Sequence, residues 1–463
     1  MASQLPISPA KLISEQSYIA PKALRVTELF FQVPLDYSKP DSRTITLFAN
    51  RVTQHCTSTD DSTEPRRYLV YLEGGPGFGN VAPQDHPLTA TALAKGYQLL
   101  LLDHRGTGLS TPVSTEMLQD LGGVDAQVDY LKLMRQDNTV RDCEAVRKCL
   151  TEGWPEHLRP WSAHGQSYGG FISMSYLSMH PEGLKEVFLT GGLPPIGVPV
   201  DEVYRKTFGK AIERNEAYFN KFPQDMDALK QIIGFVGSRT EPIVMPGGGL
   251  LTTQRLMTLG SAFGLHGGLD RIHSIILRLK TSLDQFGFLS RASLSAVETS
   301  VPFDENIIYA ILHEAIYCDG PEPSAWSASR VGKQVEGYWW LKEGHEKSRP
   351  DEPLYFSGEH VFPFYFETYA ELRPLKEVAE KLAHVDDWSP LYDVDQLRRN
   401  KVPVYAATFI EDLYVNYELA CRTAKLVKNT KVFETNLLYH NALRAKTEEV
   451  LPRLFSLRDE VID

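Results

Sequence analysis

Short apolar runs that alternate with helical patterns fill the first part of the chain. The segments 68–77 and 97–108 each begin with a continuous apolar run and end in a glycine-rich polar loop. Such runs are typical of strands buried on both faces of a sheet. Residues 126–151 have helical periodicity, and 161–181 predict a strand, a sharp turn and a helix. The alternation predicts an α/β fold whose mostly parallel central sheet has helices on both faces.

Three further segments predict strands near this core. Residues 29–35 and 44–52 are strand-like and are separated by the turn-rich segment 36–42, which predicts an opening pair of strands. Residues 186–192 predict another buried strand. We expect the regular elements to begin at about residue 25.

A change of pattern after residue 195 predicts an insertion. Residues 196–385 are richer in helical periodicity and aromatic side chains, and strand-like segments resume at 402–410 and 431–440. The sequence therefore predicts a sheet core formed by residues 1–195 and 386–463, interrupted by a large, mainly helical cap. We expect the cap above the carboxyl ends of the strands, where ligands bind in open α/β sheets.

The composition is that of a globular protein that folds without disulfides. Hydrophobic residues make up 42% and charged residues 23% of the 463 residues, a length that can bury a sizeable core. The five cysteines form no CxxC pair; they are Cys56, Cys143, Cys149, Cys318 and Cys421. We expect reduced thiols in a cytoplasmic protein, with no metal site.

The N-terminal sequence and the net charge narrow the choice of partners. The N-terminal stretch MASQLPISPAKLISEQ has no basic region followed by an apolar run, so we expect no signal peptide. The sequence contains no apolar run of about 18 residues, so we expect no membrane-spanning helix. The net charge of −11 disfavours nucleic acid and suits a cationic ligand such as a protonated amine.

The strongest chemical motif is the stretch GQSYG, which places Ser167 between Gly165 and Gly169. It matches the GxSxG nucleophile elbow, in which a serine sits on a strained turn from a strand to a helix. An apolar strand precedes the motif and a helical pattern follows it, as this turn requires. The alternative is a serine in an ordinary turn. The sequence predicts Ser167 as a nucleophile.

A serine hydroxyl needs a base to take its proton and a third group to orient that base. In this fold the chain order is serine, then an acid, then histidine. Asp412 follows the predicted strand 402–410, and His440 ends the strand-like segment 431–440. The loops that follow these two strands are then expected to lie at the same edge of the sheet. We predict Asp412 as the acid, with adjacent Glu411 as its rival, and His440 as the base.

Acyl transfer also needs donors for the oxyanion. One predicted donor is the backbone N–H of Tyr168, directly after the nucleophile. The other is expected from the loop that contains Gly74 and Gly75, although this loop could be a plain tight turn. DHRGTGLS, at 103–110, is expected to be structural, with Asp103 and Arg105 tying backbone and loops together.

Several motifs together resemble the proline iminopeptidase (prolyl aminopeptidase) family in its larger-cap form. They occur in order along most of the chain, as EGGPGFG, DHRGTGLS, GQSYGGF, LTGGLPP, LHEAIYCDG, FSGEHVFPF and YHNALR. The resemblance implies hydrolysis of the peptide bond after an unblocked N-terminal residue, commonly proline, without metal or cofactor. It assigns Ser167, Asp412 and His440 as the triad, and the Gly74 and Tyr168 amides as oxyanion donors.

The resemblance also implies that acidic cap residues bind the substrate's α-amino group. Glu314 and Glu359 match these positions. A free α-amino group is largely cationic at neutral pH, so carboxylates in a partly desolvated pocket would hold it. Four aromatic residues are expected to wall the proline ring, although each could equally be an ordinary core residue: Tyr317, Phe356, Phe362 and Phe364.

Glu73 departs from the family pattern, in which His or Gln often precedes GGPG. A carboxylate beside the oxyanion site would oppose the developing charge unless it is paired or turned away. It could instead help to hold the substrate ammonium.

Three alternatives stay open. The chain could be an esterase or amidase of the same fold, or an aminopeptidase that prefers another residue. A non-catalytic binding protein is a further alternative, because fold does not fix function. We expect peptide or aminoacyl substrates and a possible homo-oligomer. The sequence leaves the preferred residue, the peptide length limit and the pathway undetermined.

Overall fold

The computed structural model describes residues 6–39, 41–55, 65–342 and 353–460. Its main sheet has nine strands in the order β1-β2-β3-β5-β4-β6-β7-β10-β11. The strands are β1 (Lys11–Ala20), β2 (Leu24–Pro34), β3 (Thr44–Gln54), β4 (Tyr68–Leu72), β5 (Gln98–Leu102), β6 (Trp161–Gln166), β7 (Leu184–Thr190), β10 (Val404–Phe409) and β11 (Thr430–Thr435). From β5 to β11 all neighbours are parallel, whereas β1, β2, β3 and β5 pair antiparallel. The predicted mostly parallel α/β sheet is confirmed.

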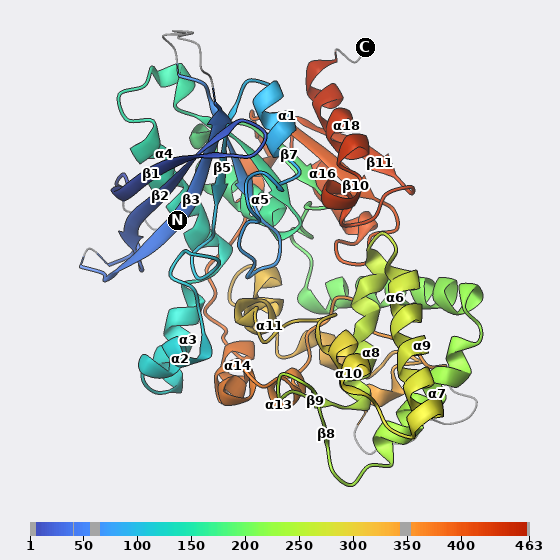
Figure 1. The fold of residues 1–463 in the computed structure, drawn as a ribbon. Helices are drawn as coiled ribbons and strands as arrows, with labels where there is room; N and C mark the ends of the chain where they lie inside the picture. The colour runs from blue at the N-terminus through green and yellow to red at the C-terminus, as the bar shows by residue number, and fades with distance from the viewer. Residues whose placement is uncertain (1–5, 40, 56–64, 343–352, 461–463) are drawn as a thin grey trace.

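Helices cover both faces of this sheet, as its apolar strands require. Successive residues of β4 point to opposite faces, so Val70 joins one hydrophobic core while Leu69 and Tyr71 join another. The first core contains α4 (Gln136–Leu150) and α5 (Tyr168–Met179); the second contains α1 (Thr89–Ala94) and α18 (Thr447–Asp459). Figure 1 shows these helices around the central strands, while β1, β2 and β3 extend outward at one side of the sheet.

The predicted strands fall on β2, β3, β4, β5, β6, β7, β10 and β11. The helical pattern over 126–151 corresponds to two helices, α3 (Val124–Lys132) and α4, and the chain between them is not helical. Buried Arg135 has extended backbone angles there, and its guanidinium donates hydrogen bonds to the carbonyl oxygens of Cys318 and Ser389.

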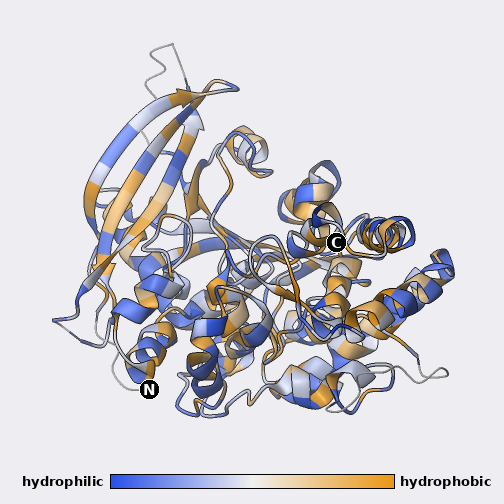
Figure 2. Cartoon of the chain, turned by 60° about the horizontal axis from the view of Figure 1, so that its bottom comes forward, coloured by the Kyte–Doolittle hydropathy of each residue, from blue (hydrophilic) through white to orange (hydrophobic). Residues whose placement is uncertain are grey.

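The expected start of regular structure near residue 25 is wrong, because β1 precedes it. Nine of the ten residues of β1 are exposed, and its large apolar residues, Leu12, Ile13, Tyr18 and Ile19, neither alternate with polar residues nor form a continuous run, so no strand period marks it. Backbone hydrogen bonds to β2 hold this strand in the sheet, in an antiparallel pairing that places Lys11 opposite Gln32. Figure 2 shows the alternation of hydrophilic and hydrophobic residues along the long N-terminal strands.

A large, mostly helical segment separates β7 from β10, although these strands are neighbours in the sheet, with Val187 opposite Val404. It contains α6 (Val200–Lys221), α7 (Asp225–Gly237), α8 (Thr253–Met257), α9 (Gly268–Phe286), α10 (Arg291–Glu298), α11 (Ile307–Leu312), α12 (Ser327–Gly332), α13 (Tyr365–Thr368), α14 (Lys376–Ala383) and a small hairpin, β8 (Ile243–Val244) with β9 (Leu250–Leu251). Figure 1 shows these elements below the sheet. We refer to this segment as the cap; the domain boundaries at 195/196 and 385/386 stay predictions.

The loop after β5 is structural, as predicted. Asp103 accepts hydrogen bonds from the N–H groups of Asn80 and Leu109, at 2.8 and 3.0 Å. Arg105 is fully buried and donates two hydrogen bonds to Asp142, at 2.6 and 2.7 Å. These contacts fix the loop from inside the core.

Two expectations concern the chain as a whole. Cys56 lies outside the described residues, and the four described cysteines form no disulfide. Among the helices of the described ranges, none is long and apolar enough to cross a membrane.

Candidate active site

Ser167 lies on the sharp turn between β6 and α5, with φ 53° and ψ −121°. This positive φ is strained for a residue with a side chain. The glycines beside it are required by space. A Cβ on Gly169 would lie 1.9 Å from the carbonyl oxygen of Leu72, and one on Gly170 would lie 2.1 Å from that of Gly192. The predicted turn geometry is therefore present.

Three distant residues meet at the carboxyl ends of the strands. The Ser167 hydroxyl lies 2.9 Å from Nε2 of His440, and Nδ1 of His440 lies 2.9 Å from Oδ2 of Asp412. The other carboxylate oxygen of Asp412 accepts hydrogen bonds from the N–H groups of Tyr414 and Val415, at 2.8 and 3.0 Å. Asp412 is thus held as the acceptor for the Nδ1 proton, which leaves Nε2 free to accept the serine proton.

The surroundings of His440 favour its protonated form. Burial lowers the pKa of the imidazole, but the charge and hydrogen bond of Asp412 raise it, and the net pKa lies above its ordinary value. The ring of Tyr414 stacks on the imidazole at 4.4 Å between centroids. A Cβ on Gly191 would lie only 3.1 Å from Nδ1. The base is therefore basic enough to take a proton and is fixed in orientation.

Glu411, the rival for the role of the acid, lies elsewhere. Its carboxylate is 3.5 Å from Nζ of Lys210 and is about one-third exposed. Of the two adjacent carboxylates, only Asp412 contacts His440.

The predicted oxyanion donors differ in availability. The N–H of Gly74 donates to Oε1 of Glu73 at 2.8 Å, so this donor is already engaged. Gly74 and Gly75 both line the cavity at Ser167, so the engaged N–H is what distinguishes Gly74. Tyr168 is the first residue of α5, and the N–H groups of a first helical turn have no acceptor within the helix. Gly75 and Tyr168 are the better candidates on this geometry.

Glu73 is paired, which resolves the conflict that its charge raised. Its carboxylate forms an ion pair with Arg444 and accepts hydrogen bonds from the hydroxyl of Tyr71 and from Gly74 N–H. The side chain is almost fully buried, whereas Arg444 is about two-fifths exposed. The negative charge beside the oxyanion site is therefore balanced from within the protein.

A cavity of about 460 Å³ opens onto Ser167 and His440. Its volume lies in the range of small-molecule sites. Five aromatic residues line it, namely Phe78, Phe303, Tyr309, Tyr365 and Tyr414. None of these was predicted: Phe78 lies in the EGGPGFG motif, in which no role was assigned to it, and nothing in the other segments distinguishes a pocket wall from a core.

Glu359 also lines this cavity, as the sequence predicted. Its carboxylate accepts a hydrogen bond from the hydroxyl of Tyr309 and lies 3.6 Å from Nε2 of His313. The side chain is about one-eighth exposed. This partly desolvated carboxylate faces the space in front of Ser167 and can accept a cationic group there.

Glu314 has a different environment from the one the resemblance implied. It is absent from the lining of the Ser167 cavity, and its two oxygens accept the N–H groups of Ser327 and Ala328, at 3.1 and 2.9 Å. Burial raises the pKa of this carboxyl, and the two N–H groups oppose that effect. Because it satisfies the free donors at the start of α12, its geometry is that of a helix-capping residue.

The four predicted wall aromatics do not line the Ser167 cavity either. Phe362 and Phe364 stack on each other with centroids 5.2 Å apart, and Phe356 packs against Phe263. Tyr317 lines two smaller cavities. Apolar packing inside the cap, which has no sequence period, determines where these rings point, and their role at the substrate stays a prediction.

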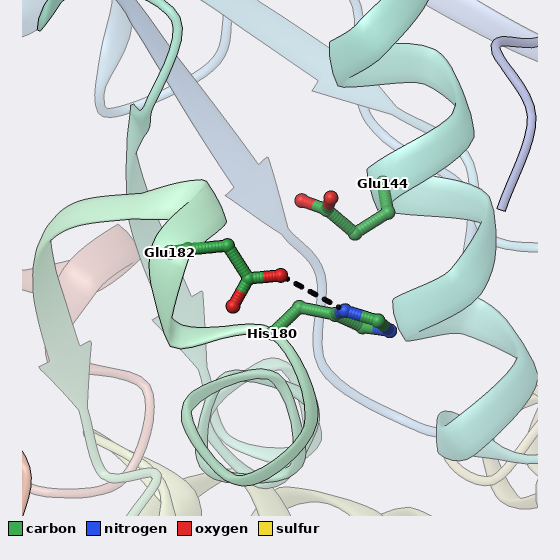
Figure 3. Close-up of side chains that lie close together, drawn as sticks. All are labelled: Glu144, His180 and Glu182. Atoms are coloured by element: carbon green, nitrogen blue, oxygen red, sulfur yellow. Dashed lines mark hydrogen bonds and ion pairs between the residues drawn. The ribbon is translucent and has the colours of Figure 1, made fainter. Parts of the chain in front are cut away.

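Among the residues that the structure describes, one group of possible metal ligands lies away from the cavity. Glu144, His180 and Glu182 place ligand atoms within 4.8 Å of one another, and Figure 3 shows His180 pointing to Glu182. Glu144 already accepts two hydrogen bonds from Arg147, both at 2.7 Å, and one from Tyr176 at 2.6 Å. Its charge is thus neutralised by Arg147, and the group has no need of an ion.

Comparison with known proteins places this geometry in context. Residues 68–232 match the α/β hydrolase fold family. The chain is 42% identical to the proline iminopeptidase aneH of Aspergillus aculeatus over 464 aligned residues, which cover 100% of both proteins. It is 39% identical to a proline iminopeptidase of Aeromonas sobria, over 92% of this chain and 95% of that protein. A solved proline iminopeptidase from Mycobacterium smegmatis is 13% identical and covers 92% of this chain and 97% of its own, with a TM-score of 0.41.

Proposed function

Because the chain belongs to the proline iminopeptidase family, we propose that it is a serine aminopeptidase that releases an unblocked N-terminal residue, preferentially proline. The observation that carries the proposal is the series of hydrogen bonds from Ser167 through His440 to Asp412, at 2.9 Å each. It opens into a cavity that also contains the carboxylate of Glu359.

The proposed reaction begins with attack by the Ser167 hydroxyl on the carbonyl carbon of the first residue. Nε2 of His440 takes the hydroxyl proton, and Asp412 stabilises the imidazolium that forms. The N–H groups of Gly75 and Tyr168 are proposed to stabilise the oxyanion. His440 then donates the proton to the leaving amine, which leaves an acyl-enzyme on Ser167. Water then attacks the acyl-enzyme carbonyl while His440 takes its proton, and the released product is the free N-terminal amino acid, with the proton returned to the Ser167 oxygen.

The amine site limits the reaction to the chain end. Glu359 is proposed to bind the substrate ammonium, which is largely protonated at neutral pH. A substrate anchored in this way presents its first carbonyl to Ser167 and no later one. The rings of Phe78, Tyr309 and Tyr414 offer apolar surface to a proline ring.

The test uses prolyl and alanyl p-nitroanilides together with their N-acetylated forms. We expect the free prolyl substrate to be hydrolysed fastest and the acetylated ones to resist hydrolysis. Ser167→Ala is expected to abolish turnover. Ser178→Ala is the matched control, because within the described part of the chain the hydroxyl of Ser178 forms its hydrogen bond with Met174 O of the same helix.

The outcomes separate the alternatives. Equal hydrolysis of free and acetylated substrates would indicate an esterase or amidase of the same fold. Preference for alanyl over prolyl substrate would indicate another residue specificity, and lack of hydrolysis of every substrate would indicate a binding protein. The cytoplasmic location and the possible homo-oligomer stay predictions.

A further inference from the structure

Arg271 is an exposed cationic side chain that lines the Ser167 cavity, and no carboxylate in the part of the chain that the structure describes forms an ion pair with it. Arg444, which also lines the cavity, is paired with Glu73. Within the described ranges, the contact found for the Arg271 guanidinium is the hydroxyl of Ser300 at 3.5 Å. In a chain with a net charge of −11, such a cation is a local site for an anion.

The backbone just before Arg271 is joined to the loop that carries His440. Arg271 lies in the first turn of α9, directly after a segment that is hydrogen-bonded to the histidine loop. In that segment Gly264 O accepts the N–H of His440 at 3.2 Å, and Nε2 of His266 accepts the N–H of Tyr439 at 3.1 Å.

A second observation agrees with this position. Burial and the negative charge of Glu359 raise the pKa of Tyr414, and Arg271 lowers it. Because Tyr414 stacks on the imidazole of His440, the charges of Glu359 and Arg271 both act on a ring beside the base.

The reaction determines which part of the substrate lies next to His440. His440 protonates the leaving amine, so the residue after the hydrolysed bond must lie next to His440. In a dipeptide this residue carries the C-terminal carboxylate, which lies within about one residue length, roughly 3.5 Å, of the leaving nitrogen. A substrate that carries its cation toward Glu359 would then have Arg271 in the same cavity as a partner for its anion.

We propose that Arg271 binds the free C-terminal carboxylate of a dipeptide or tripeptide, so that the enzyme favours short peptides with both ends unblocked. The inference rests on the proposed function. Guanidinium and carboxylate form strong charge-assisted hydrogen bonds, and this match would select short peptides over longer chains, whose carboxylate lies beyond reach.

The experiment compares Pro-Ala with Pro-Ala amide by measuring proline release. These substrates share the ammonium, the hydrolysed bond and the leaving residue, and they differ only in the terminal carboxylate. The unmodified enzyme is expected to favour the free acid in kcat/KM by about tenfold. Arg271→Gln is expected to lose this preference, and Arg271→Lys to retain part of it.

Two controls report on the integrity of the active site. Prolyl p-nitroanilide has no carboxylate, so Arg271→Gln should hydrolyse it within about twofold of the unmodified rate. Arg278→Gln is the matched variant, because Arg278 is exposed on the same helix and does not line the cavity; it should keep the preference for the free acid.

Each result decides the matter. Equal kcat/KM for the free acid and the amide in the unmodified enzyme would overturn the inference and leave the proposed function intact. Parallel losses on all three substrates in Arg271→Gln would also overturn it, since they would indicate a structural role. If the unmodified enzyme released no proline from any of the three, the proposed function and this inference would fail together.

Discussion

Glu359 and Glu314 are two cap carboxylates with similar expected roles and different surroundings. Glu359 lines the Ser167 cavity, whereas Glu314 caps α12. We expect Glu359→Gln to lower kcat/KM for free prolyl substrates by roughly 10- to 100-fold, since it removes the charge that holds the ammonium. Glu314→Gln should leave KM nearly unchanged and lower the unfolding temperature instead. The opposite pattern would return the amine site to Glu314.

The pH dependence of the reaction is set by His440. The base must be neutral to accept the Ser167 proton, and Asp412 holds its pKa above the ordinary value of 6.5. Activity is therefore present above that raised pKa and is lost as the pH falls through it. We expect the acid limb of kcat/KM to have its midpoint above 6.5.

Asp412→Asn checks the cause of this shift. It removes the charge that favours the imidazolium, so the acid limb should move to lower pH while kcat falls by roughly 10³- to 10⁴-fold. If the midpoint of the acid limb did not move in Asp412→Asn, a group other than His440 would determine that midpoint.

At the scale of elements, a strap from the cap holds the histidine loop. The strap is residues 261–266, and it bonds to the loop 439–441 through His440 N–H, Tyr439 N–H and the side chain of Asn441. Tyr414, from the loop after β10, donates its hydroxyl to Ser261 O at 2.6 Å. The cap therefore contributes to the placement of the base as well as to the walls of the cavity.

His266 tests this arrangement. Its Nε2 accepts the N–H of Tyr439, which requires a neutral ring, and burial lowers its pKa in the direction that keeps it neutral. We expect His266→Ala to lower kcat by about tenfold with a smaller effect on KM, because a displaced base slows the chemical step. His266→Gln retains an acceptor and should recover part of the loss. If both variants had the same kcat as the unmodified enzyme, the strap would have no role in placing the base.

At the scale of the whole molecule, Arg105 links segments that are distant in sequence. It donates to Asp142 on α4 and to the carbonyl oxygens of Leu35 and Leu133. Arg105→Ala would leave the Asp142 charge buried without its partner, so we expect a loss of about 3–5 kcal/mol in the free energy of unfolding. Urea denaturation measures it. Arg205→Ala, which breaks an exposed pair with Glu202, should cost less than about 1 kcal/mol.

The sheet and the three residues of the predicted triad could be predicted because their signals are local. Buried parallel strands are continuous apolar runs, and Ser167, Asp412 and His440 each follow or end such a run. The carboxyl ends of parallel strands meet at one edge, so knowledge of the strands places the residues that follow them. β1 escaped prediction because backbone pairing with β2 orders it while its side chains stay exposed.

By itself, the sequence determined the fold class, the elbow glycines and the order of serine, acid and base, because each depends on neighbours along the chain or on one strand period. Only the tertiary structure decided that Glu359 faces the cavity while Glu314 caps a helix, and that Arg444 neutralises Glu73. These choices depend on which side chains meet across the cap and the core. Such meetings follow from packing in three dimensions, which leaves no period or spacing in the chain.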